Sequence, residues 1–216
     1  LKGESFNGNA FAGKALEDGC AFAIIDEAQY AIEGDRRYIL VNDCLQTLQQ
    51  LANYHRRQLG TRVIGITGTK GKTTTTYMVK SILENAGYKV GLIGTIEAVI
   101  GEKHIPAANT TPESYMVQKY FHDMVEAGCD AVVMEVSSQG LMLHRTQGFV
   151  FDFGIFTNIE PDHIGPNEHK DFDDYLHCKS ILLRQCKVGI VNRDDEHFDR
   201  ICLLYTSPSP RDMRRS

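Results

Sequence analysis

The fold of this chain is decided by residues 63–75, which spell VIGITGTKGKTTT in one-letter code. Residues 63–67 are a short apolar run of the kind that forms a buried strand, and a helical pattern begins at Lys72. Between them, Gly68 and Gly71 allow backbone N–H groups to converge on a phosphate group at the positive end of the helix dipole. The stretch therefore predicts a strand, a phosphate-binding loop and a helix, as in ATP-using enzymes.

The side chains of this loop have separate expected roles. Lys72 supplies a mobile positive charge for the outer phosphates of ATP, and the Thr73 hydroxyl is suited to bind Mg²⁺. The common pattern places a glycine where this chain has Ile66, with Gly65 one position away, so we interpret the loop as a variant. A glycine-rich turn with an incidental lysine is the alternative. The residues expected to bind the nucleotide are Gly68, Thr69, Lys70, Gly71, Lys72, Thr73 and Thr74.

The sequence that follows the loop alternates between short apolar runs and helical patterns, which is typical of an α/β fold. Such alternation predicts a mostly parallel, doubly wound sheet with right-handed crossovers, whose ligands gather at the carboxyl ends of the strands. We expect this sheet domain to be incomplete and to leave an exposed strand edge. The expected strands are 63–67, 90–94, 131–136, 154–157 and 188–191, and the expected helices are 72–86, 114–127 and 172–186.

Two further regions flank the sheet domain, which is expected at residues 61–202. Residues 1–60 are predicted to form a small N-terminal α/β domain, and the start at Leu1 suggests that the native start lies upstream. Residues 203–216 are rich in Ser, Pro and Arg and resemble translated sequencing adapter, so we expect a disordered or non-native tail. The first domain is expected to contain a helix at 10–16, strands at 21–25 and 38–41, and a helix capped at Asn42-Asp43.

Composition excludes several classes of protein. The chain has 216 residues, of which 42% are hydrophobic and 24% charged, as in soluble globular proteins. Its net charge of -5 does not provide the basic field that nucleic acid requires. No apolar run approaches the roughly 20 residues that span a bilayer, and no signal peptide opens the chain. The 6 cysteines form no CxxC pair, which is typical of reduced thiols, so we expect a cytoplasmic protein without membrane insertion.

Three side chains beyond the loop are candidates for metal chemistry. Glu135 lies near the carboxyl end of a buried strand, where a carboxylate reaches an ion held by the loop; satisfaction by backbone amides is the alternative. His163 also follows a strand directly, either as a metal ligand or as an ordinary loop histidine. Lys179 lies on an amphipathic helix, and from the residues alone it is a solvated charge. Surface positions are expected for His169, His177 and His197.

Four further motifs follow the loop in a fixed order and carry a family resemblance. Together with the loop they cover about residues 62–195 and resemble the Mur ligases, which build peptidoglycan precursors. The Thr-Thr-Pro-Glu and Glu-Val-Ser-Ser forms are similar to the branch that adds the third residue to UDP-MurNAc-L-Ala-D-Glu. The motifs are Asn109-Thr110-Thr111-Pro112-Glu113, Glu135-Val136-Ser137-Ser138, Thr157-Asn158-Ile159-x-x-Asp162-His163 and Tyr175-Leu176-His177-Cys178-Lys179.

The resemblance implies a mechanism and roles for individual residues. ATP phosphorylates the substrate carboxylate, and the amine of an amino acid attacks the acyl phosphate to form an amide. Lys72 stabilises the transferring phosphoryl group, while Thr73 and Glu135 bind one Mg²⁺. His163 and a carbamylated Lys179 serve a second Mg²⁺, and Lys72, His163 and Lys179 form the catalytic group. The UDP-muramyl peptide is expected to contact Thr110, Thr111, Ser137 and Arg145, and the protein is expected to act as a monomer.

The chain departs from the family pattern in two respects. Residues 1–8 and 51–57 look more like the branch that adds D-Ala-D-Ala, so a chimera of two genes, joined in the nucleotide loop, is one hypothesis. The family's C-terminal domain is also absent, so we expect a fragment that is inactive by itself. The alternatives are a D-Ala-D-Ala-adding Mur ligase, a folylpolyglutamate synthetase, which the motif forms disfavour, and a non-catalytic nucleotide-binding fragment or unstable debris.

Overall fold

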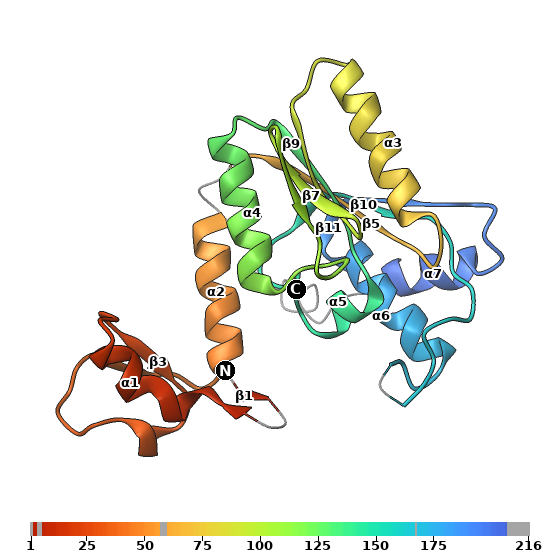
Figure 1. The fold of residues 1–216 in the computed structure, drawn as a ribbon. Coiled ribbons are helices and arrows are strands. Elements are labelled where there is room, and N and C mark those ends of the chain that lie inside the picture. The colour runs from red at the N-terminus through yellow and green to blue at the C-terminus, as the bar shows by residue number, and fades with distance from the viewer. Residues whose placement is uncertain (1, 4–5, 57–59, 167, 207–216) are drawn as a thin grey trace, which may run out of the picture. The chain divides into compact units, whose positions relative to one another are not determined.

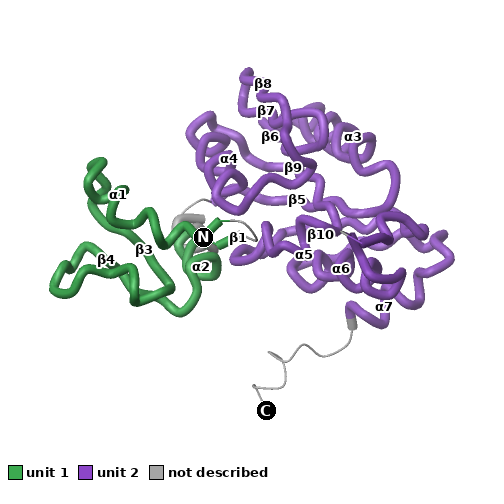
Figure 2. The backbone as a smooth tube through the Cα atoms, turned by 60° about the horizontal axis from the view of Figure 1, so that its bottom comes forward, with its two compact units in different colours: residues 1–52 green, residues 53–216 purple. Residues whose placement is uncertain are grey.

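The computed structural model describes residues 2–3, 6–56, 60–166 and 168–206. Figure 1 shows the helices and strands in these ranges. The chain divides into two compact units, unit 1 (Leu1–Ala52) and unit 2 (Asn53–Ser216), which Figure 2 distinguishes by colour. Each unit has its own buried apolar cluster, so each is described by itself.

Unit 1 is a small α/β unit, as its sequence predicts. Helix α1 (Ala12–Glu17) packs on the parallel strands β3 (Ala23–Ile25) and β4 (Tyr38–Leu40). The buried apolar residues Ala12, Leu16, Ala23 and Ile25 form its core. Helix α2 (Cys44–Arg56) begins at the predicted cap, because the Asp43 carboxylate accepts a hydrogen bond of 2.8 Å from the Gln46 N–H. The remaining elements are β1 (Lys2–Gly3), β2 (Phe6–Asn7) and the 3₁₀ turns Gly8–Phe11 and Ala28–Tyr30.

Unit 2 is built on a 7-stranded sheet with the order β11-β10-β5-β9-β6-β7-β8. All neighbouring strands from β11 to β6 are parallel, which confirms the predicted, mostly parallel sheet. The antiparallel strands β7 and β8 extend one edge and were not predicted from the sequence. The strands are β5 (Arg62–Thr67), β6 (Val90–Ile93), β7 (Glu97–Ile100), β8 (Lys103–Pro106), β9 (Ala131–Glu135), β10 (Phe151–Phe156) and β11 (Cys186–Val191).

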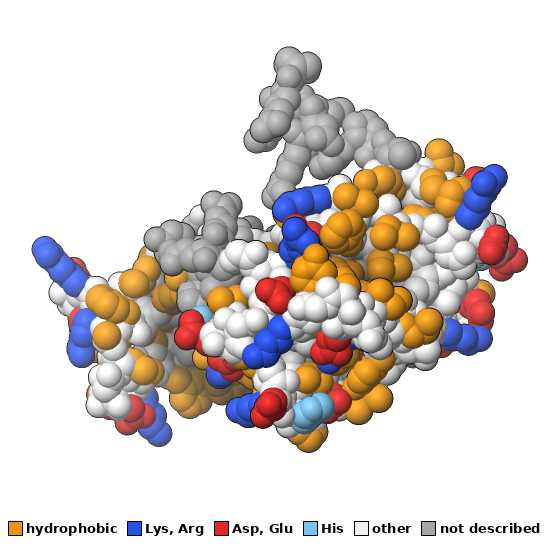
Figure 3. Space-filling model, turned by 90° about the horizontal axis from the view of Figure 1, so that it is seen from above, with side chains coloured by type: hydrophobic (Ala, Val, Ile, Leu, Met, Phe, Trp, Pro, Cys, Tyr) orange, Lys and Arg blue, Asp and Glu red, His pale blue; other side chains and the backbone are white. Residues whose placement is uncertain are grey.

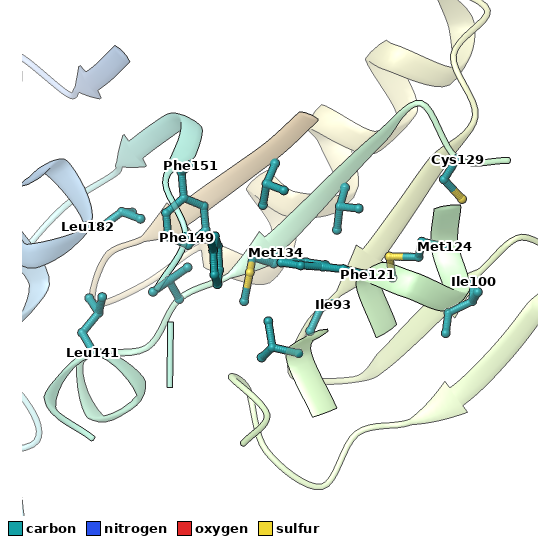
Figure 4. Packing of buried hydrophobic residues seen from close by; sticks show 14 residues of the cluster. Ile93, Ile100, Phe121, Met124, Cys129, Met134, Leu141, Phe149, Phe151 and Leu182 are labelled. Atoms are coloured by element: carbon teal, nitrogen blue, oxygen red, sulfur yellow. The ribbon is translucent and has the colours of Figure 1, made fainter. Parts of the chain in front are cut away.

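Helices cover both faces of this sheet, which confirms the doubly wound architecture (Figure 1). On one face, α3 (Lys72–Asn85) packs through Val79 and Leu83 on a cluster that contains Ile64 and Ile66 of β5. On the other face, α4 (Ser114–Glu126) and α6 (Phe172–Arg184) share the largest apolar cluster, which Figure 4 shows from close by. The central strands bury side chains on both faces, and this explains their near-continuous apolar sequence.

The edge formed by β11 is exposed, as expected of an incomplete sheet. Within the described residues β11 pairs only with β10, and its side chains Val188 and Ile190 are exposed. Helix α7 (Phe198–Thr206) packs beside α6, so the predicted tail at 203–216 is helical as far as Thr206. Its Leu204 packs against a buried cluster, which explains the difference; residues 207–216 lie outside the described part of the chain.

Charges of both signs are spread over the surface of the described residues (Figure 3). On the face that Figure 3 shows, Lys and Arg side chains are interspersed with Asp and Glu side chains. Among the described residues, no helix combines the length and apolar character needed to cross a membrane.

The strand order places a topological switch point at β5. The chain leaves β5 through α3 toward β6 and β9 on one side, and later returns to β10 on the other side. Loops that follow β5, β9 and β10 therefore meet at one edge of the sheet, where α/β proteins bind their ligands. The predicted phosphate loop follows β5 at this edge.

Candidate active site

Glycines shape the loop after β5 in the way the sequence predicts. Gly68 has a φ of +154°, and a Cβ atom at this position would lie 2.0 Å from the Thr157 hydroxyl oxygen. Gly71 has a φ of +76° and caps the start of α3. No other residue type combines these backbone angles with such a close approach, so the conformation of the loop requires glycine.

The glycine that precedes the loop has a different role. A Cβ atom on Gly65 would lie 2.8 Å from Leu182 and from Phe151. Gly65 therefore permits α6 and β10 to pack closely on β5, and it is a packing residue of the strand. The loop thus lacks the glycine that the common pattern places at position 66, and the neighbouring Gly65 serves packing of the strand.

The segment after β10 holds the phosphate loop in place. Asn158 accepts a hydrogen bond of 2.9 Å from the Lys70 N–H through its side-chain oxygen and donates one of 3.0 Å to the Lys70 carbonyl. Its own carbonyl accepts from the Thr69 N–H at 3.0 Å. The Thr69 hydroxyl bonds to the Tyr175 hydroxyl at 3.1 Å, and Lys70 pairs with Glu160. Asn158 belongs to the motif that runs from Thr157 to His163, and the sequence alone predicts no role for its side chain.

Two lysine ammonium groups converge on one carbonyl oxygen of the loop. Lys72 and Lys179 each donate a hydrogen bond of 2.8 Å from Nζ to the Gly68 carbonyl, and Lys72 also donates to the Thr69 carbonyl at 3.1 Å. Burial lowers the pKa of Lys72. Two like charges at one carbonyl, in a largely buried position, form a site that favours an anion.

Lys179 is the least solvated of these charges. Its side chain is 1% exposed, and Nζ lies 4.7 Å above the centre of the Tyr175 ring. Burial, and next the neighbouring Lys72 charge, lower the pKa of Lys179 to about 7. The solvated position expected from the residues alone is wrong, because α6 turns this face toward the phosphate loop. Tyr175 is one helical turn before Lys179, a spacing that was visible in the sequence.

Glu135 lies at the end of β9, beside the start of α3. Its side chain is 0% exposed, and its Oε2 accepts hydrogen bonds from the Thr73 hydroxyl at 3.1 Å and the Thr95 hydroxyl at 2.9 Å. Its Oε1 accepts from the Thr95 N–H at 3.1 Å. The structure thus brings Thr73 and Glu135 together and adds Thr95, which sequence reasoning missed. Thr95 lies two residues after the end of β6 at Ile93, and Glu135 ends the neighbouring parallel strand β9, so a polar residue just beyond a strand was the available signal.

The structure places the predicted histidines differently from one another. His163 is exposed, with a φ of +52° and Nδ1 3.2 Å from Glu168. His169 is buried, so its predicted surface position is wrong: its Nδ1 lies 3.2 Å from Asp174, and its ring packs against Tyr175. His177 is exposed as predicted, whereas His197 is half-buried.

A cleft of about 350 Å³ adjoins the loop and contains the four residues predicted to contact a muramyl substrate. The Thr111 side chain is buried, and its hydroxyl accepts a hydrogen bond of 2.9 Å from the Ser137 N–H. Arg145 donates to the Thr111 carbonyl at 3.0 Å and pairs with Glu113 at 2.5 Å. The lining residues are Lys72, Thr95, Ala108, Asn109, Thr110, Thr111, Ser137, Ser138, Gln139, Met142, Arg145, His163, Glu168 and His169.

Other predicted residues lie outside this lining. Thr73, Glu135 and Lys179 are not part of the cleft wall. Thr74 is exposed in the first turn of α3. Of the predicted catalytic residues, Lys72 and His163 line the cleft, and Lys72 also bonds to the phosphate loop.

A family model and the sequences of related proteins point to the same protein family. A model of the Mur ligase middle domain matches residues 66–208. The chain is 43% identical over 203 residues to UDP-N-acetylmuramoyl-L-alanyl-D-glutamate--2,6-diaminopimelate ligase 1 of Clostridium acetobutylicum, covering 93% of this chain and 42% of that protein. It is 41% identical over 205 residues to the corresponding ligase of Clostridium tetani, with the same coverage.

Solved structures show the same fold. A UDP-N-acetylmuramoyl-L-alanyl-D-glutamate--2,6-diaminopimelate ligase superposes with a TM-score of 0.76 at 24% identity, over 94% of this chain and 41% of that one. MurF ligase from Thermotoga maritima in complex with ADP gives a TM-score of 0.62 at 20% identity, over 93% of this chain and 43% of that one.

The alignments also bear on the organisation of the chain. The chain spans 42% of the length of the Clostridium ligases it matches. An alignment of 203 residues must include most of unit 1, so one relative accounts for both units and the hypothesis of two joined genes is not required. The family match covers more than half of the chain and includes the loop, Glu135 and Lys179, and the chain therefore belongs to the Mur ligase family.

Proposed function

We propose that this chain is part of an ATP-dependent ligase that adds the third residue to UDP-MurNAc-L-Ala-D-Glu during peptidoglycan synthesis. The names of its relatives support 2,6-diaminopimelate as the amino acid. The observation that carries the proposal is the convergence of the Lys72 and Lys179 side-chain nitrogens on the Gly68 carbonyl of the phosphate loop, beside the cleft. We further propose that the protein acts as a monomer in the cytoplasm, where ATP is available.

The proposed reaction has two steps, phosphorylation of a carboxylate and formation of an amide. A carboxylate oxygen of the muramyl peptide forms a bond to the γ-phosphorus of ATP, the bond to the bridging oxygen breaks, and ADP leaves. The amine of the amino acid then attacks the acyl carbon, an amide forms, and phosphate and a proton leave. Lys72 balances the negative charge that spreads over the phosphoryl oxygens during the first step, from its position at the phosphate loop.

The donor set beside the loop fits Mg²⁺. Thr73 and Glu135 present oxygen atoms 3.1 Å apart, and hard cations prefer hydroxyl and carboxylate oxygens. When bound there, Mg²⁺ supplies positive charge to the phosphate oxygens. Thr95 orients the carboxylate through two hydrogen bonds, and Gly94 leaves room for it, because a Cβ there would lie 2.6 Å from Glu135 Oε1.

Lys179 is suited to become a carbamate. With its pKa lowered to about 7, a large share of the amine is neutral at neutral pH. The nitrogen lone pair can attack CO₂, an N–C bond forms and a proton leaves, and the resulting anion sits next to the Lys72 ammonium. His163 and Lys179 both lie against Tyr175, so together they offer a nitrogen and carbamate oxygens to a second cation.

The cleft supports binding of the muramyl peptide. Among the described residues, the buried Nε of Arg145 has no hydrogen-bond partner, and Arg145 lines the cleft together with Thr110 and Ser137. A guanidinium suits carboxylate or phosphate groups of the substrate. We assign unit 1 to the partial domain that precedes the nucleotide domain in this family and receives the UDP part of the substrate.

Ligand-dependent thermal unfolding of the chain tests this function. We expect Mg-ATP and UDP-MurNAc-L-Ala-D-Glu each to raise the melting temperature, since ligands that bind only the folded state stabilise it. Lys72→Ala should remove the ATP effect, and Arg145→Ala should remove the effect of the muramyl peptide. A larger shift with the muramyl tripeptide than with the dipeptide would indicate the D-Ala-D-Ala-adding branch. Absence of a shift with every ligand would contradict nucleotide and muramyl binding alike.

A further inference from the structure

A second group of metal-type ligands lies at the start of α6, apart from Thr73 and Glu135. Asp174 and Cys178 are one helical turn apart on α6, so they face the same side. The loop before the helix adds His169. One ligand atom from each residue is available, and these atoms all lie within 4.8 Å of one another.

The burial of the three residues resembles that of a metal site. His169 is 1% exposed and Cys178 is 6% exposed, while the Asp174 side chain is 29% exposed and provides an entry path from solvent. Among the described residues, the Cys178 thiol has no hydrogen-bond partner, whereas His169 and Asp174 share one hydrogen bond of 3.2 Å. A cation would therefore use a ligand that the fold leaves without a polar contact.

The loop that carries His169 is already positioned. The His169 N–H donates to the His163 carbonyl at 3.0 Å, and the His169 carbonyl accepts from the Gly165 N–H at 3.1 Å. Its ring centre lies 5.1 Å from that of Tyr175. On the helix side, the Asp171 carboxylate caps α6 by accepting from the Asp174 N–H at 2.8 Å. Both halves of the cluster are thus held without a metal ion, and pre-positioned ligands favour binding.

The chemical types of the three ligand atoms favour zinc over magnesium. Imidazole nitrogen, carboxylate oxygen and thiolate sulfur are ligands of zinc, whereas magnesium takes oxygen ligands. Zinc bonds of about 2.0–2.3 Å separate tetrahedral ligand atoms by about 3.5 Å, so the cluster needs to contract by about 1 Å. On binding, the Cys178 S–H proton leaves to solvent. The two anionic ligands then neutralise the double charge of the ion, which suits a buried position.

We propose that His169, Asp174 and Cys178 form a binding site for a thiophilic divalent cation of the zinc class, with water as the fourth ligand. The bound ion would tie the loop that carries His163 to the helix that carries Lys179. We assign the ion a structural role, because it would connect two segments that both carry side chains next to the phosphate loop and the cleft. Binding at this cluster requires neither ATP nor a muramyl substrate, so it can be tested independently of the ligase function.

Titration of the reduced, metal-free chain with Co²⁺ tests the proposal. Cobalt bound to a thiolate gives an intense near-ultraviolet charge-transfer band, which a site with only oxygen and nitrogen ligands does not give. We expect this band at one equivalent of Co²⁺, its loss on addition of Zn²⁺, and its persistence in a large excess of Mg²⁺. Zn²⁺ should also raise the melting temperature.

Two substitutions and a matched control identify the ligands. Cys178→Ser should abolish the band, and Asp174→Asn should weaken Co²⁺ binding by roughly tenfold or more while retaining the hydrogen bond to His169. Cys186→Ser is the control, because burial raises the pKa of this thiol as well, yet Cys186 belongs to no such cluster in the described part of the chain. Its band should be unchanged.

Two results of the cobalt titration would contradict the proposed metal site. No band in the unmodified chain, or a band that survives in Cys178→Ser, overturns the proposal. Circular dichroism verifies that each variant folds. If Cys178→Ser does not fold, the partly exposed Asp174→Asn variant decides, and affinity equal to that of the unmodified chain then contradicts the site.

Discussion

An aspartate in unit 1 and a lysine in unit 2 affect stability in opposite directions. Asp26 accepts hydrogen bonds from the Cys44 N–H at 3.1 Å and the Asn9 amide at 2.7 Å, and these lower the pKa of Asp26 to about 2. Burial lowers the pKa of Lys179 to about 7, and its ammonium donates a hydrogen bond to the Gly68 carbonyl. The first charge is satisfied and stabilises its unit, whereas the second opposes folding, as is common at functional sites.

Removing the Lys179 charge should give the largest effect on stability. The pKa of Lys179 is 10.5 in an unfolded chain and about 7 in the folded chain. Between pH 7 and pH 10.5 the unfolded chain therefore carries the proton on Lys179 and the folded chain does not. Stability of unit 2 should therefore rise as pH increases from 7 toward 10.5. Lys179→Met should remove this rise and stabilise the fold at pH 7 by on the order of 3 kcal/mol.

Thermal unfolding in CO₂-free buffer at several pH values measures this effect. Lys119→Met is the control, since Lys119 is exposed and pairs with Asp123 on the surface of α4. If Lys179→Met is less stable than the unmodified chain at pH 7, the ammonium is not an unfavourable charge, and the contrast with Asp26 fails.

The loop that receives the Lys179 hydrogen bond should tolerate almost no added atoms. Gly68→Ala places a Cβ 2.0 Å from the Thr157 hydroxyl at a φ of +154°, and should cost roughly 2–4 kcal/mol and abolish nucleotide binding. Gly87→Ala is the matched control, because Gly87 has a φ of +90° with nothing within 4 Å of the added atom, and should cost about 1 kcal/mol. If both variants lose the same free energy of unfolding in urea, backbone strain alone explains the loss and the close contact with Thr157 does not contribute.

Breaking the Asp26 network should weaken unit 1 by a smaller amount. Asp26→Asn removes the charge that accepts from Cys44 and Asn9, and should lower the protection of the β3 and β4 amides against hydrogen exchange. Stability that Asp26 contributes is present above its usual pKa of 3.8 and is lost as pH falls toward 2. Asp18→Asn should leave exchange unchanged. Protection that persists in Asp26→Asn would contradict a stabilising role.

The smallest effect is expected at Tyr175. Tyr175→Phe removes the hydrogen bond to Thr69 but keeps the ring beneath Lys179, so it should cost about 1 kcal/mol. Tyr77→Phe is a close control, since Tyr77 donates to Glu97 at 2.9 Å, away from the loop. Burial is the main cause that raises the pKa of both tyrosines to about 12. Weaker ATP binding should appear only in Tyr175→Phe; equal binding by both variants would exclude a role for the hydroxyl in positioning the loop.

Much of the architecture could be predicted because the signals are local. Strands that are buried on both faces need continuous apolar runs, and β9 and β5 show them. The hairpin of β7 and β8 was missed because it extends the sheet edge, where only one strand of the pair is buried. Helix α5 (Ser138–Met142) was missed because it is short, and its cap at Ser137 is part of a motif interpreted only as a substrate contact.

The sequence by itself determined the phosphate loop, the order of strands and helices around it, and the candidates Lys72, Thr73 and Glu135, because glycine turns and apolar periodicity act over a few residues. Only the tertiary structure decided that Lys179 is buried against Gly68 and that His169 joins Asp174 and Cys178. The free energy of an ionised or metal-binding side chain depends on the solvent it loses and the neighbours it meets, and those neighbours come from distant parts of the chain.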